Sequence, residues 1–322
     1  MRTAIVLMNL GGPDRLSAVR PFLYNLFADP AIIRLPAWLR LPLAQVVAWR
    51  RAETAREIYA QLDGGSPLLV NTEAQAQALE QALGPSWRCF IAMRYWHPLT
   101  PEAVAAVKAW QPEKIVLLPL YPQYSTTTTA SSLATWHREV GRQDLRVVTT
   151  EIRSYPQAPG FIAAQATLIS ATLAREAGQA GADCPMRFLF SAHGLPLKIV
   201  EAGDPYPTEI QQTADALAAA VMSRSFDWVV CYQSRVGPLA WLGPSVDQEL
   251  RRAARDRVGV VVVPVSFVSE HSETLVELDR DYRRLAERYG VPFYWRVPTV
   301  GTEPAFIEAL AGLVRAAAGS AT

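Results

Sequence analysis

The stretch FLFSAHGLP at residues 188–196 decides the fold, because a short apolar run ends at His193 just where glycine and proline turn the chain. A second apolar run, GVVVVPVS at 259–266, leads into a polar segment in the same way. Short uninterrupted runs of this kind, rich in valine and phenylalanine, are typical of strands buried on both faces of a parallel sheet. Both runs therefore predict a strand that delivers polar side chains at its carboxyl end.

Further strand-like runs recur along the chain, with helical stretches between most of them. With the two above they cover residues 2–10, 88–94, 114–120, 144–150, 187–192, 227–232, 259–266 and 292–297. This alternation predicts an α/β fold with parallel sheets flanked by helices. In such sheets ligands bind beyond the carboxyl ends of the strands.

The first four strands and the last four follow one plan. VLMNLGGP parallels FLFSAHGLP, and VLLPLYPQYSTTTT parallels VVVPVSFVSEHSET. We therefore expect two similar Rossmann-like half-domains, each a four-stranded parallel sheet, facing a central cleft. The predicted boundaries are 1–150 and 151–322, with the last helix packing back on the N-terminal half.

The N-terminal half carries an insertion between Gly11 and Pro98 that its counterpart lacks. We place it at about 25–70, centred on LPAWLRLPLAQVVAWRR at 35–51. That segment mixes tryptophan, leucine and valine with arginines at its end. It reads as an apolar lip edged with positive charge.

Composition excludes several classes of protein. The 322 residues carry a net charge of +1, and the basic residues are scattered, so nucleic acid is not an expected partner. No apolar run is long enough for a membrane-spanning helix, and the N-terminus lacks the features of a signal peptide. The three dispersed cysteines predict neither a disulfide framework nor a structural zinc site. We expect a cytoplasmic chain that contacts membranes at most peripherally.

One histidine and a row of acids form the candidate metal site. Glu273, Glu277 and Asp281 are four residues apart on the helix expected after 266, which places them on one face. Beside His193, such carboxylates suit a hard or borderline divalent metal such as Fe(II) or Zn(II). The alternative is the solvated face of an amphipathic helix, but Glu270, His271 and Glu273 crowd its first turn, and such crowding is tolerated where a cation binds.

Other motifs allow simpler interpretations. His137 lies in a helical stretch and is read as structural. The turns GGP at 11–13 and GGSP at 64–67 fit neither a GxGxxG motif nor a P-loop, so nucleotide binding has little support. Tyr206 in GDPYP and Trp241 between two Gly-Pro pairs are interpreted as rigid walls for a flat apolar ring.

The chain resembles the ferrochelatases, which insert iron into a porphyrin. The resemblance rests on eight segments in family order: LMNLGGP (7–13), QLDGGSPL (61–68), MRYWHP (93–98), LPLYPQYSTTTTASSL (118–133), SAHGLP (191–196), GDPYP (203–207), CYQSRVGPLAWLGPSVD (231–247) and SFVSEHSETLVELD (266–279). It implies a chelatase-like fold and an enzyme, a lyase of haem biosynthesis that inserts Fe(II) into a tetrapyrrole. The choice of protoporphyrin IX rests on the lip at 35–51, whose apolar residues end at Arg50 and Arg51 and so match a porphyrin with one apolar edge and one acidic edge.

The resemblance also implies site roles. His193 and Glu273 are the catalytic and metal-binding pair, and Glu277 and Asp281 form a path along a helix that contains a π-type turn. Porphyrin contacts fall to a further set: Leu10 in the N-terminal loop, Arg51, Tyr59 and Ser66 toward the propionates, and Arg94 in the pocket. Apart from the resemblance, the apolar residues and arginines of the lip at 35–51 make it the expected site of any membrane contact.

No organic cofactor is implied, and no iron–sulfur cluster is expected. Relatives that hold a [2Fe–2S] cluster use a cysteine in the QYS segment and three in a C-terminal extension, whereas here Thr126 follows QYS and no cysteine follows Cys231. Three alternatives stay open: a coproporphyrin ferrochelatase, a cobalt or nickel chelatase for a related tetrapyrrole, and a protein that binds a tetrapyrrole without turning it over. The acidic row favours catalysis over simple binding.

Overall fold

The computed structural model describes the whole chain except residues 1, 177–183, 222–226, 236, 238 and 320–322. Its internal contacts divide the chain into two compact units. The first runs to Ser154 and takes in the chain from Ile307 on, while the second spans Tyr155–Phe306. The predicted boundary at 150/151 is close to this division, and the last helix, α11 (Pro304–Gly319), contributes most of its length to the first unit.

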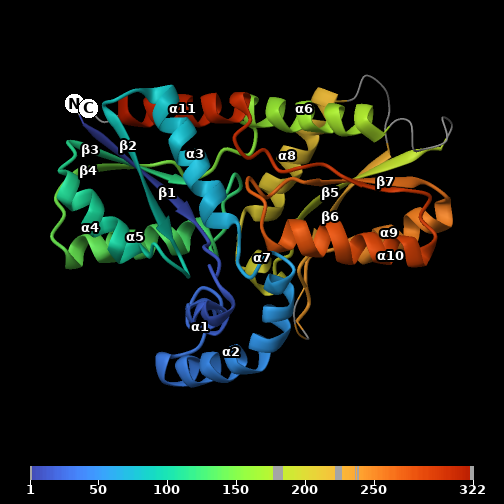
Figure 1. Cartoon of the computed structure of the whole chain (residues 1–322), viewed down its shortest axis with the longest axis horizontal. Coiled ribbons are helices and arrows are strands. Elements are labelled where there is room, and N and C mark those ends of the chain that lie inside the picture. The colour runs from blue at the N-terminus through green and yellow to red at the C-terminus, as the bar shows by residue number, and fades with distance from the viewer. Residues whose placement is uncertain (1, 177–183, 222–226, 236, 238, 320–322) are drawn as a thin grey trace. The chain divides into compact units, whose positions relative to one another are not determined.

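The first unit is built on a four-stranded parallel sheet with the order β2-β1-β3-β4 (Figure 1). Its strands are β1 (Thr3–Asn9), β2 (Trp87–Met93), β3 (Lys114–Pro119) and β4 (Val148–Glu151). Every residue of β1 is buried, as its uninterrupted apolar sequence predicts for a central parallel strand. The helices of this sheet are α3 (Leu68–Leu83), α4 (Thr100–Trp110) and α5 (Thr129–Arg142).

One hydrophobic core joins a face of this sheet to α4 and α5. It includes Val6 of β1, Leu117 of β3, Val104 of α4 and the fully buried Trp136 of α5. Burial of such side chains contributes about 25 cal/mol per Å² of apolar surface. This core fixes the strand ends that carry the loops.

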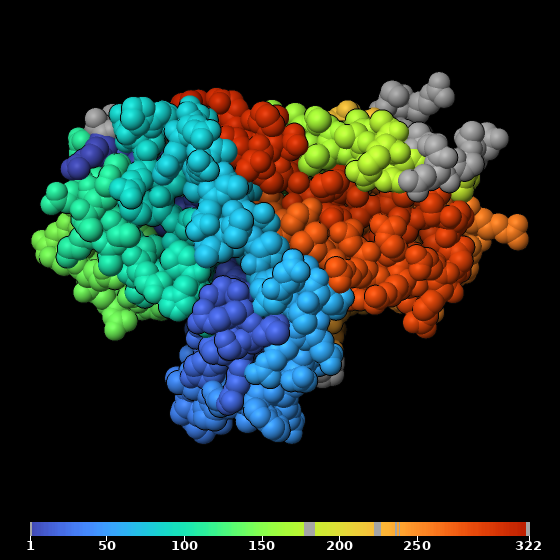
Figure 2. Space-filling model, viewed as in Figure 1, coloured from blue at the N-terminus to red at the C-terminus, as the bar shows by residue number. Residues whose placement is uncertain are grey.

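The insertion predicted at about 25–70 falls mainly on one long helix, which packs against a shorter helix that begins before residue 25, and the two project from the rest of the first unit (Figure 2). They are α1 (Val19–Phe27), preceded by the short 3-10 helix η1 (Leu16–Ala18), and α2 (Ala37–Ala60). Along α2, Ala44, Ala48 and Ala52 are buried, while Trp38 and Trp49 are 73% and 65% exposed. The apolar lip is therefore a helix face that this unit leaves uncovered. None of the described helices is both long and apolar enough to span a bilayer.

The second unit repeats the plan with the sheet order β6-β5-β7-β8, again parallel throughout. The strands are β5 (Met186–His193), β6 (Asp227–Gln233), β7 (Gly259–Pro264) and β8 (Tyr294–Arg296). The helices are α6 (Pro159–Glu176), α7 (Leu197–Glu201), α8 (Tyr206–Val221), α9 (Val246–Asp256) and α10 (Arg283–Tyr289). The matching strand orders confirm the prediction of two similar α/β halves.

Between β7 and α10 the chain forms a π-helix, η2 (Glu273–Tyr282), where an acidic helix was expected. A π-helix closes i→i+5 hydrogen bonds and is rare at this length. The prediction of a π-type turn falls here, but the feature occupies ten residues instead of one turn. The strand predicted at 144–150 begins only at Val148, because Asp144 adopts a left-handed backbone with φ 50° that a strand does not accept.

Candidate functional site

His193 is the last residue of β5 and lies at the carboxyl edge of the second sheet. Its strand pairing with Gln233 and the bond from its backbone N–H to Ser266 Oγ, 3.1 Å, hold it between β6 and the segment after β7. Gly194 follows because a Cβ at that position would lie 2.7 Å from the Gln233 carbonyl oxygen. The side chain of His193 is 43% exposed, so it is not part of a hydrophobic core.

Glu273, the first residue of the π-helix, lies between two imidazoles. Its Oε2 atom is 3.7 Å from Nε2 of His193 and 3.8 Å from Nε2 of His271. This oxygen is buried and accepts no hydrogen bond from the part of the chain that the structure describes. The structure thus brings the predicted pair His193 and Glu273 together and adds His271.

The hydrogen-bond partner of Nδ1 in each of the two imidazoles shows which ring nitrogen carries the hydrogen. Nδ1 of His193 is 2.6 Å from the Gly194 carbonyl oxygen, and Nδ1 of His271 is 3.0 Å from that of Ser269. A carbonyl oxygen only accepts, so each Nδ1 carries the hydrogen. Both Nε2 atoms lie within 3.8 Å of the same carboxylate oxygen, an arrangement that a proton or a metal cation stabilises.

The pKa shifts agree with a site that favours positive charge. Burial alone would raise the pKa of Glu273, but His193 and His271 outweigh it and lower this pKa to about 2. Burial works against the charged form of His271, yet the neighbouring carboxylate of Glu273 raises its pKa. Glu273 is therefore ionised at neutral pH and attracts a cation.

Glu277 is the second member of the acidic row and differs chemically from the first. Its carboxylate accepts hydrogen bonds from the backbone N–H of Ser234 at 2.8 Å, from the Ser234 hydroxyl at 2.6 Å and from Gln233 Nε2 at 3.1 Å. Burial first and the charge of Glu273 second raise its pKa despite these bonds. Glu277 accordingly accepts a proton more readily than an ordinary carboxylate.

Asp281 ends the row at the surface. Its side chain is 56% exposed and lies 3.9 Å from Arg284 Nη1. Residues four apart stay near one face of the wide π-helical turn, so the row leads from the enclosed Glu273 to solvent.

The two predicted aromatic walls of this unit lie near His193 in different ways. Tyr206 is buried at the start of α8, and its hydroxyl donates to the His193 carbonyl oxygen at 3.2 Å. Burial raises the pKa of Tyr206, so the phenol is neutral. Trp241 pairs through its backbone with Pro196, and its ring lies against Gly194, although Pro238 of the preceding Gly-Pro pair lies outside the described residues.

The predicted porphyrin contacts in the first unit are grouped only in part. Leu10 and the buried Tyr59 belong to one apolar cluster with Tyr95 and Trp96. Ser66 sits on the neighbouring turn, where a Cβ on Gly12 would lie 2.5 Å from its Oγ.

Two arginines of this unit differ in whether a carboxylate neutralises their charge. Arg51 is exposed, lies 5.8 Å from the Phe27 ring and pairs with no carboxylate among the described residues. Arg94 is already bound, since it donates to Asp29 at 2.7 Å and to Ser131 at 2.9 Å. Arg51 therefore has a free charge, whereas the charge of Arg94 is compensated.

Sequence reasoning assigned no role to three residues that complete this site: His271, Gln233 and Ser234. Gln233 spans the site, because its Nε2 donates to the Glu273 carbonyl oxygen at 3.0 Å and its Oε1 accepts from Ser191 at 2.8 Å. His271 had a signal in the segment SEHSE, and Gln233 and Ser234 lie at the carboxyl end of β6, where Gln233 pairs with His193. Among the described residues no group of three or more His, Cys, Asp or Glu side chains is arranged to hold a metal ion, so metal ligation by His193 and Glu273 stays a prediction.

Several solved structures share this fold at low sequence identity. SirB from Bacillus subtilis with Fe3+ superimposes with a TM-score of 0.57 at 13% identity, covering 99% of this chain and 97% of its own. CbiX, described as the terminal enzyme for biosynthesis of siroheme in denitrifying bacteria, gives 0.51 at 14% identity, with 98% and 99% covered. These likenesses support the fold alone.

Curated relatives are much closer in sequence. A ferrochelatase of Caulobacter vibrioides is 52% identical over 99% of this chain and 91% of its own length. One from Phenylobacterium zucineum is 53% identical over 97% and 90%, and one from a Wolbachia of Drosophila simulans is 46% identical over 97% and 98%. The family model for ferrochelatase matches residues 2–318. The chain therefore belongs to the ferrochelatase family, enzymes that insert iron into a porphyrin.

Proposed function

We propose that this protein inserts Fe(II) into protoporphyrin IX and forms protohaem, the ferrochelatase step of haem biosynthesis. The observation that carries the proposal is the ionised, buried oxygen of Glu273 between the Nε2 atoms of His193 and His271. An arrangement of two nitrogen lone pairs and one carboxylate attracts either a proton or a divalent cation. Metallation of a porphyrin involves both, because protons leave the ring and a divalent cation enters it.

The reaction exchanges two protons for one metal ion. A free-base porphyrin carries two inner N–H groups, so both protons leave as Fe(II) enters, and the charge balances. Bending the flat ring exposes the nitrogen lone pairs, a strain of about 1 to 5 kcal/mol that peripheral binding supplies. The site therefore needs a base, a ligand for the metal and an exit for protons.

His193 and Glu273 fill the first two roles. Nε2 of His193 is the nitrogen that would accept a pyrrole proton or present the iron, because Nδ1 donates to a backbone carbonyl oxygen. Glu273 supplies the oxygen ligand and the negative charge. Nitrogen and oxygen ligands together suit ferrous iron, and they suit zinc as well.

Glu277 and Asp281 form the path behind this pair. The raised pKa of Glu277 fits a carboxylate that takes up a proton next to an ionised neighbour. Asp281 lies at the exposed end of the π-helix, from which protons leave to solvent or iron enters. The order of the row supports catalysis over simple binding.

We assign the porphyrin contacts to Leu10, Arg51, Tyr59, Ser66, Arg94, Tyr206 and Trp241. Arg51 is the main candidate for a propionate, because it lies against the Phe27 ring and pairs with no carboxylate in the part of the chain that the structure describes. An arginine and a carboxylate gain about 4 kcal/mol of Coulomb energy at an effective dielectric of about 20, before desolvation is subtracted. Arg94 gains less, because Asp29 already neutralises it.

The proposal includes no iron–sulfur cluster. Thr126 stands where the cysteine ligand of the QYS segment would be needed. We expect the purified protein to be colourless when free of porphyrin. Acid-labile sulfide in stoichiometric amount would overturn this part of the proposal.

The exposed face of α2 is proposed to rest on a membrane surface. Trp38 and Trp49 lie far out of the core, and Arg40 and Arg50 are on the same helix. Apolar side chains edged with arginine are typical of helices that bind at a lipid interface. An apolar porphyrin would be taken from such a surface by a cytoplasmic protein that associates with it peripherally.

The experiment that tests the function is anaerobic incubation with Fe(II) and protoporphyrin, followed by loss of free-base fluorescence. We expect turnover that depends on enzyme and iron. Tight porphyrin binding without turnover would instead identify a tetrapyrrole-binding protein.

A further inference from the structure

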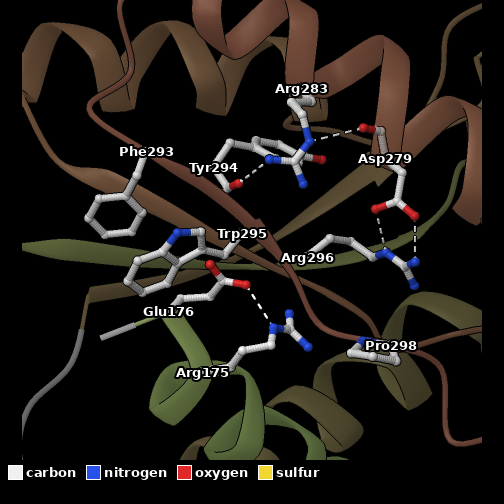
Figure 3. Close-up of a pocket in the computed structure, with 9 residues that line it drawn as sticks. All are labelled: Arg175, Glu176, Asp279, Arg283, Phe293, Tyr294, Trp295, Arg296 and Pro298. Carbon is white, nitrogen blue, oxygen red and sulfur yellow. Dashed lines mark hydrogen bonds and ion pairs between the residues drawn. The ribbon is translucent and has the colours of Figure 1, made fainter. Parts of the chain in front are cut away.

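A cavity of about 410 Å³ lies at the junction of the π-helix, α10, β8 and the end of α6 (Figure 3). Its lining is rich in arginine and aromatic residues: Arg175, Glu176, Asp279, Arg283, Phe293, Tyr294, Trp295, Arg296 and Pro298. The arginines do not form an open anion site. Arg175 pairs with Glu176 at 2.8 Å, Arg296 pairs with Asp279, and Arg283 donates to backbone carbonyl oxygens.

These polar groups join β8 to the π-helix. The Tyr294 hydroxyl donates to the Leu278 carbonyl oxygen at 2.8 Å. Arg283 donates to the Asp279 carbonyl oxygen at 3.1 Å and to that of Tyr294 at 2.8 Å. A ten-residue π-helix is intrinsically unfavourable, so contacts from outside it are needed to hold its register.

Arg296 makes the strongest of these contacts. Its side chain is 9% exposed and meets both carboxylate oxygens of Asp279, with Nε at 2.8 Å and Nη2 at 2.5 Å (Figure 3). Its Nη1 donates to Glu270 at 2.6 Å, and the same Glu270 oxygen accepts from the Thr299 backbone at 3.0 Å. A planar guanidinium can serve two carboxylates in fixed directions, whereas a lysine cannot.

The two carboxylates that Arg296 holds flank the site along the chain. Glu270 immediately precedes His271, and Asp279 follows Glu277 by two residues. Fixing both therefore fixes the segment that carries His271, Glu273 and Glu277. Buried ion pairs contribute little net stability, so specifying one conformation is the better explanation of this cluster.

We propose that Arg296 is a positioning residue for metal insertion, which acts through Asp279 and Glu270 to hold the π-helix so that Glu273 faces His193 and His271. This inference rests on the proposed function for its kinetic consequences. Displacing a reacting group by about 1 Å can cost about a hundredfold in rate. Loss of Arg296 should therefore lower catalysis without changing any group that touches substrate.

The same unit offers a matched control in Arg187. This arginine is 4% exposed and likewise pairs with two carboxylates, Asp227 at 2.7 Å and Asp256 at 2.8 Å. It lies near the start of β5, at the other end of the strand from His193. A change there removes a comparable buried ion-pair cluster without touching the π-helix.

The experiment compares Arg296→Met, Arg296→Lys and Asp279→Asn with Arg187→Met in the full-length protein. Insertion of Zn²⁺ and of Fe(II) into protoporphyrin gives kcat and separate KM values for metal and porphyrin, each corrected for the folded fraction. We expect Arg296→Met, Arg296→Lys and Asp279→Asn each to lose about tenfold to a hundredfold in kcat/KM for the metal, with the KM for porphyrin unchanged. Arg187→Met should lower Tm to a similar extent but keep wild-type kinetics.

Hydrogen exchange of the porphyrin-free protein supplies a second measurement that needs no activity. Amides of 273–282 should exchange faster in the Arg296 and Asp279 variants and stay unchanged in Arg187→Met. Wild-type exchange and kinetics in the Asp279→Asn and Arg296→Lys variants would overturn the proposal, as would an equal kinetic loss in Arg187→Met. If the wild-type protein metallates no porphyrin, the proposed function fails, while the exchange comparison still decides whether Arg296 positions the π-helix.

Discussion

Glu273 keeps its charge although it is enclosed, and the reason lies in its two imidazole neighbours. Desolvation alone would favour the protonated acid, but His193 and His271 reverse the balance and bring its pKa to about 2. Four residues further along, Glu277 has no such partner, and burial next to a charged carboxylate raises its pKa. Two glutamates on one helix thus have opposite tendencies, one to hold a cation and one to accept a proton.

Replacing His193 by alanine should abolish metallation while leaving the fold intact. The side chain is 43% exposed at a strand end, so its loss opens no cavity in the core. Activity with Fe(II) and Zn(II), together with Tm, checks this. His137→Ala is the control, because His137 is a half-exposed histidine whose Nε2 lies 2.6 Å from the carboxylate of Glu151. More than a small residual activity in His193→Ala would refute its role.

Glu273→Gln should be nearly as severe, and Glu277→Gln should be milder. The first change removes the negative charge between two imidazoles, whereas Glu277 already tends toward its neutral form. Steady-state rates of both variants at pH 7 make the comparison. If Glu277→Gln lost more activity than Glu273→Gln, the order of roles along the acidic row would be reversed.

At the scale of elements, the strand ends could be predicted from the residues themselves, whereas the π-helical geometry was implied only by the family resemblance, and only as a single turn. FLFSAH and GVVVVPVS identified β5 and β7 because continuous apolar runs are typical of buried parallel strands. Spacing cannot separate an α-helix from a π-helix over 273–282, since residues four apart share a face in both. The π-helix depends on contacts such as Arg296 with Asp279, which join residues 17 apart.

The carboxylate of Asp29 ties together three elements of the first unit. It follows α1, and its Oδ2 accepts from Arg94 at 2.7 Å, from the Tyr95 hydroxyl at 2.7 Å and from Ser131 of α5 at 2.8 Å. Burial would raise the pKa of Asp29, but the backbone N–H of Ala31 and the charge of Arg94 lower it. Asp29→Asn should cost about 3 kcal/mol at pH 7, because it leaves Arg94 without its counter-charge.

The pH dependence of this cost has a definite sign. A carboxyl whose folded-state pKa is depressed stabilises the fold above its unfolded value of about 3.9, and the contribution is lost as pH falls through the folded pKa. Denaturant unfolding from pH 7 to pH 3 should show the gap between wild type and Asp29→Asn narrowing below about pH 4. Asp144→Asn is the control, since Asp144 is 69% exposed. A gap independent of pH would show that the carboxylate charge does not contribute.

The exposed face of α2 leads to a prediction about membranes. Replacing Trp38 and Trp49 by serine should reduce binding to vesicles containing anionic lipid, because both side chains are largely exposed and pack little within the unit. Co-sedimentation measures the binding, and turnover with detergent-solubilised porphyrin should stay near wild type. Val148→Ser and Leu239→Ser, exposed apolar positions elsewhere, serve as controls. Equal binding by all variants would exclude α2 as the contact.

At the scale of the whole molecule, the repetition of one strand pattern could be predicted from the sequence, whereas the pairing of charged side chains could not. Two copies of one strand pattern predicted two sheets, and both have the same strand order. The insertion was readable as well, because one copy is longer between its first and second strands. Sequence could not show that Arg94 is neutralised by Asp29 while Arg51 is free, since each pairing depends on how distant segments pack.

That difference between the two arginines bears on the choice of porphyrin. Protoporphyrin has two propionates and two vinyl groups, so it needs one basic edge and one apolar edge. Coproporphyrin has four propionates. The helix α2 presents Trp38 and Leu41 on an exposed apolar face and ends its run of exposed apolar residues at Arg50 and Arg51. Burying an unpaired carboxylate against such a face is costly.

We therefore expect protoporphyrin to be the better substrate, and Arg51→Met to raise its KM while kcat changes little. Arg20→Met, an exposed arginine on the neighbouring α1, is the matched control. The decisive measurement is competition between the two porphyrins at equal concentration with Fe(II). Because the discrimination comes from an extra carboxylate facing apolar side chains, replacing Trp38 by lysine should narrow the preference. A higher kcat/KM for coproporphyrin in the wild-type protein would defeat this choice of substrate and leave iron insertion by His193 and Glu273 standing.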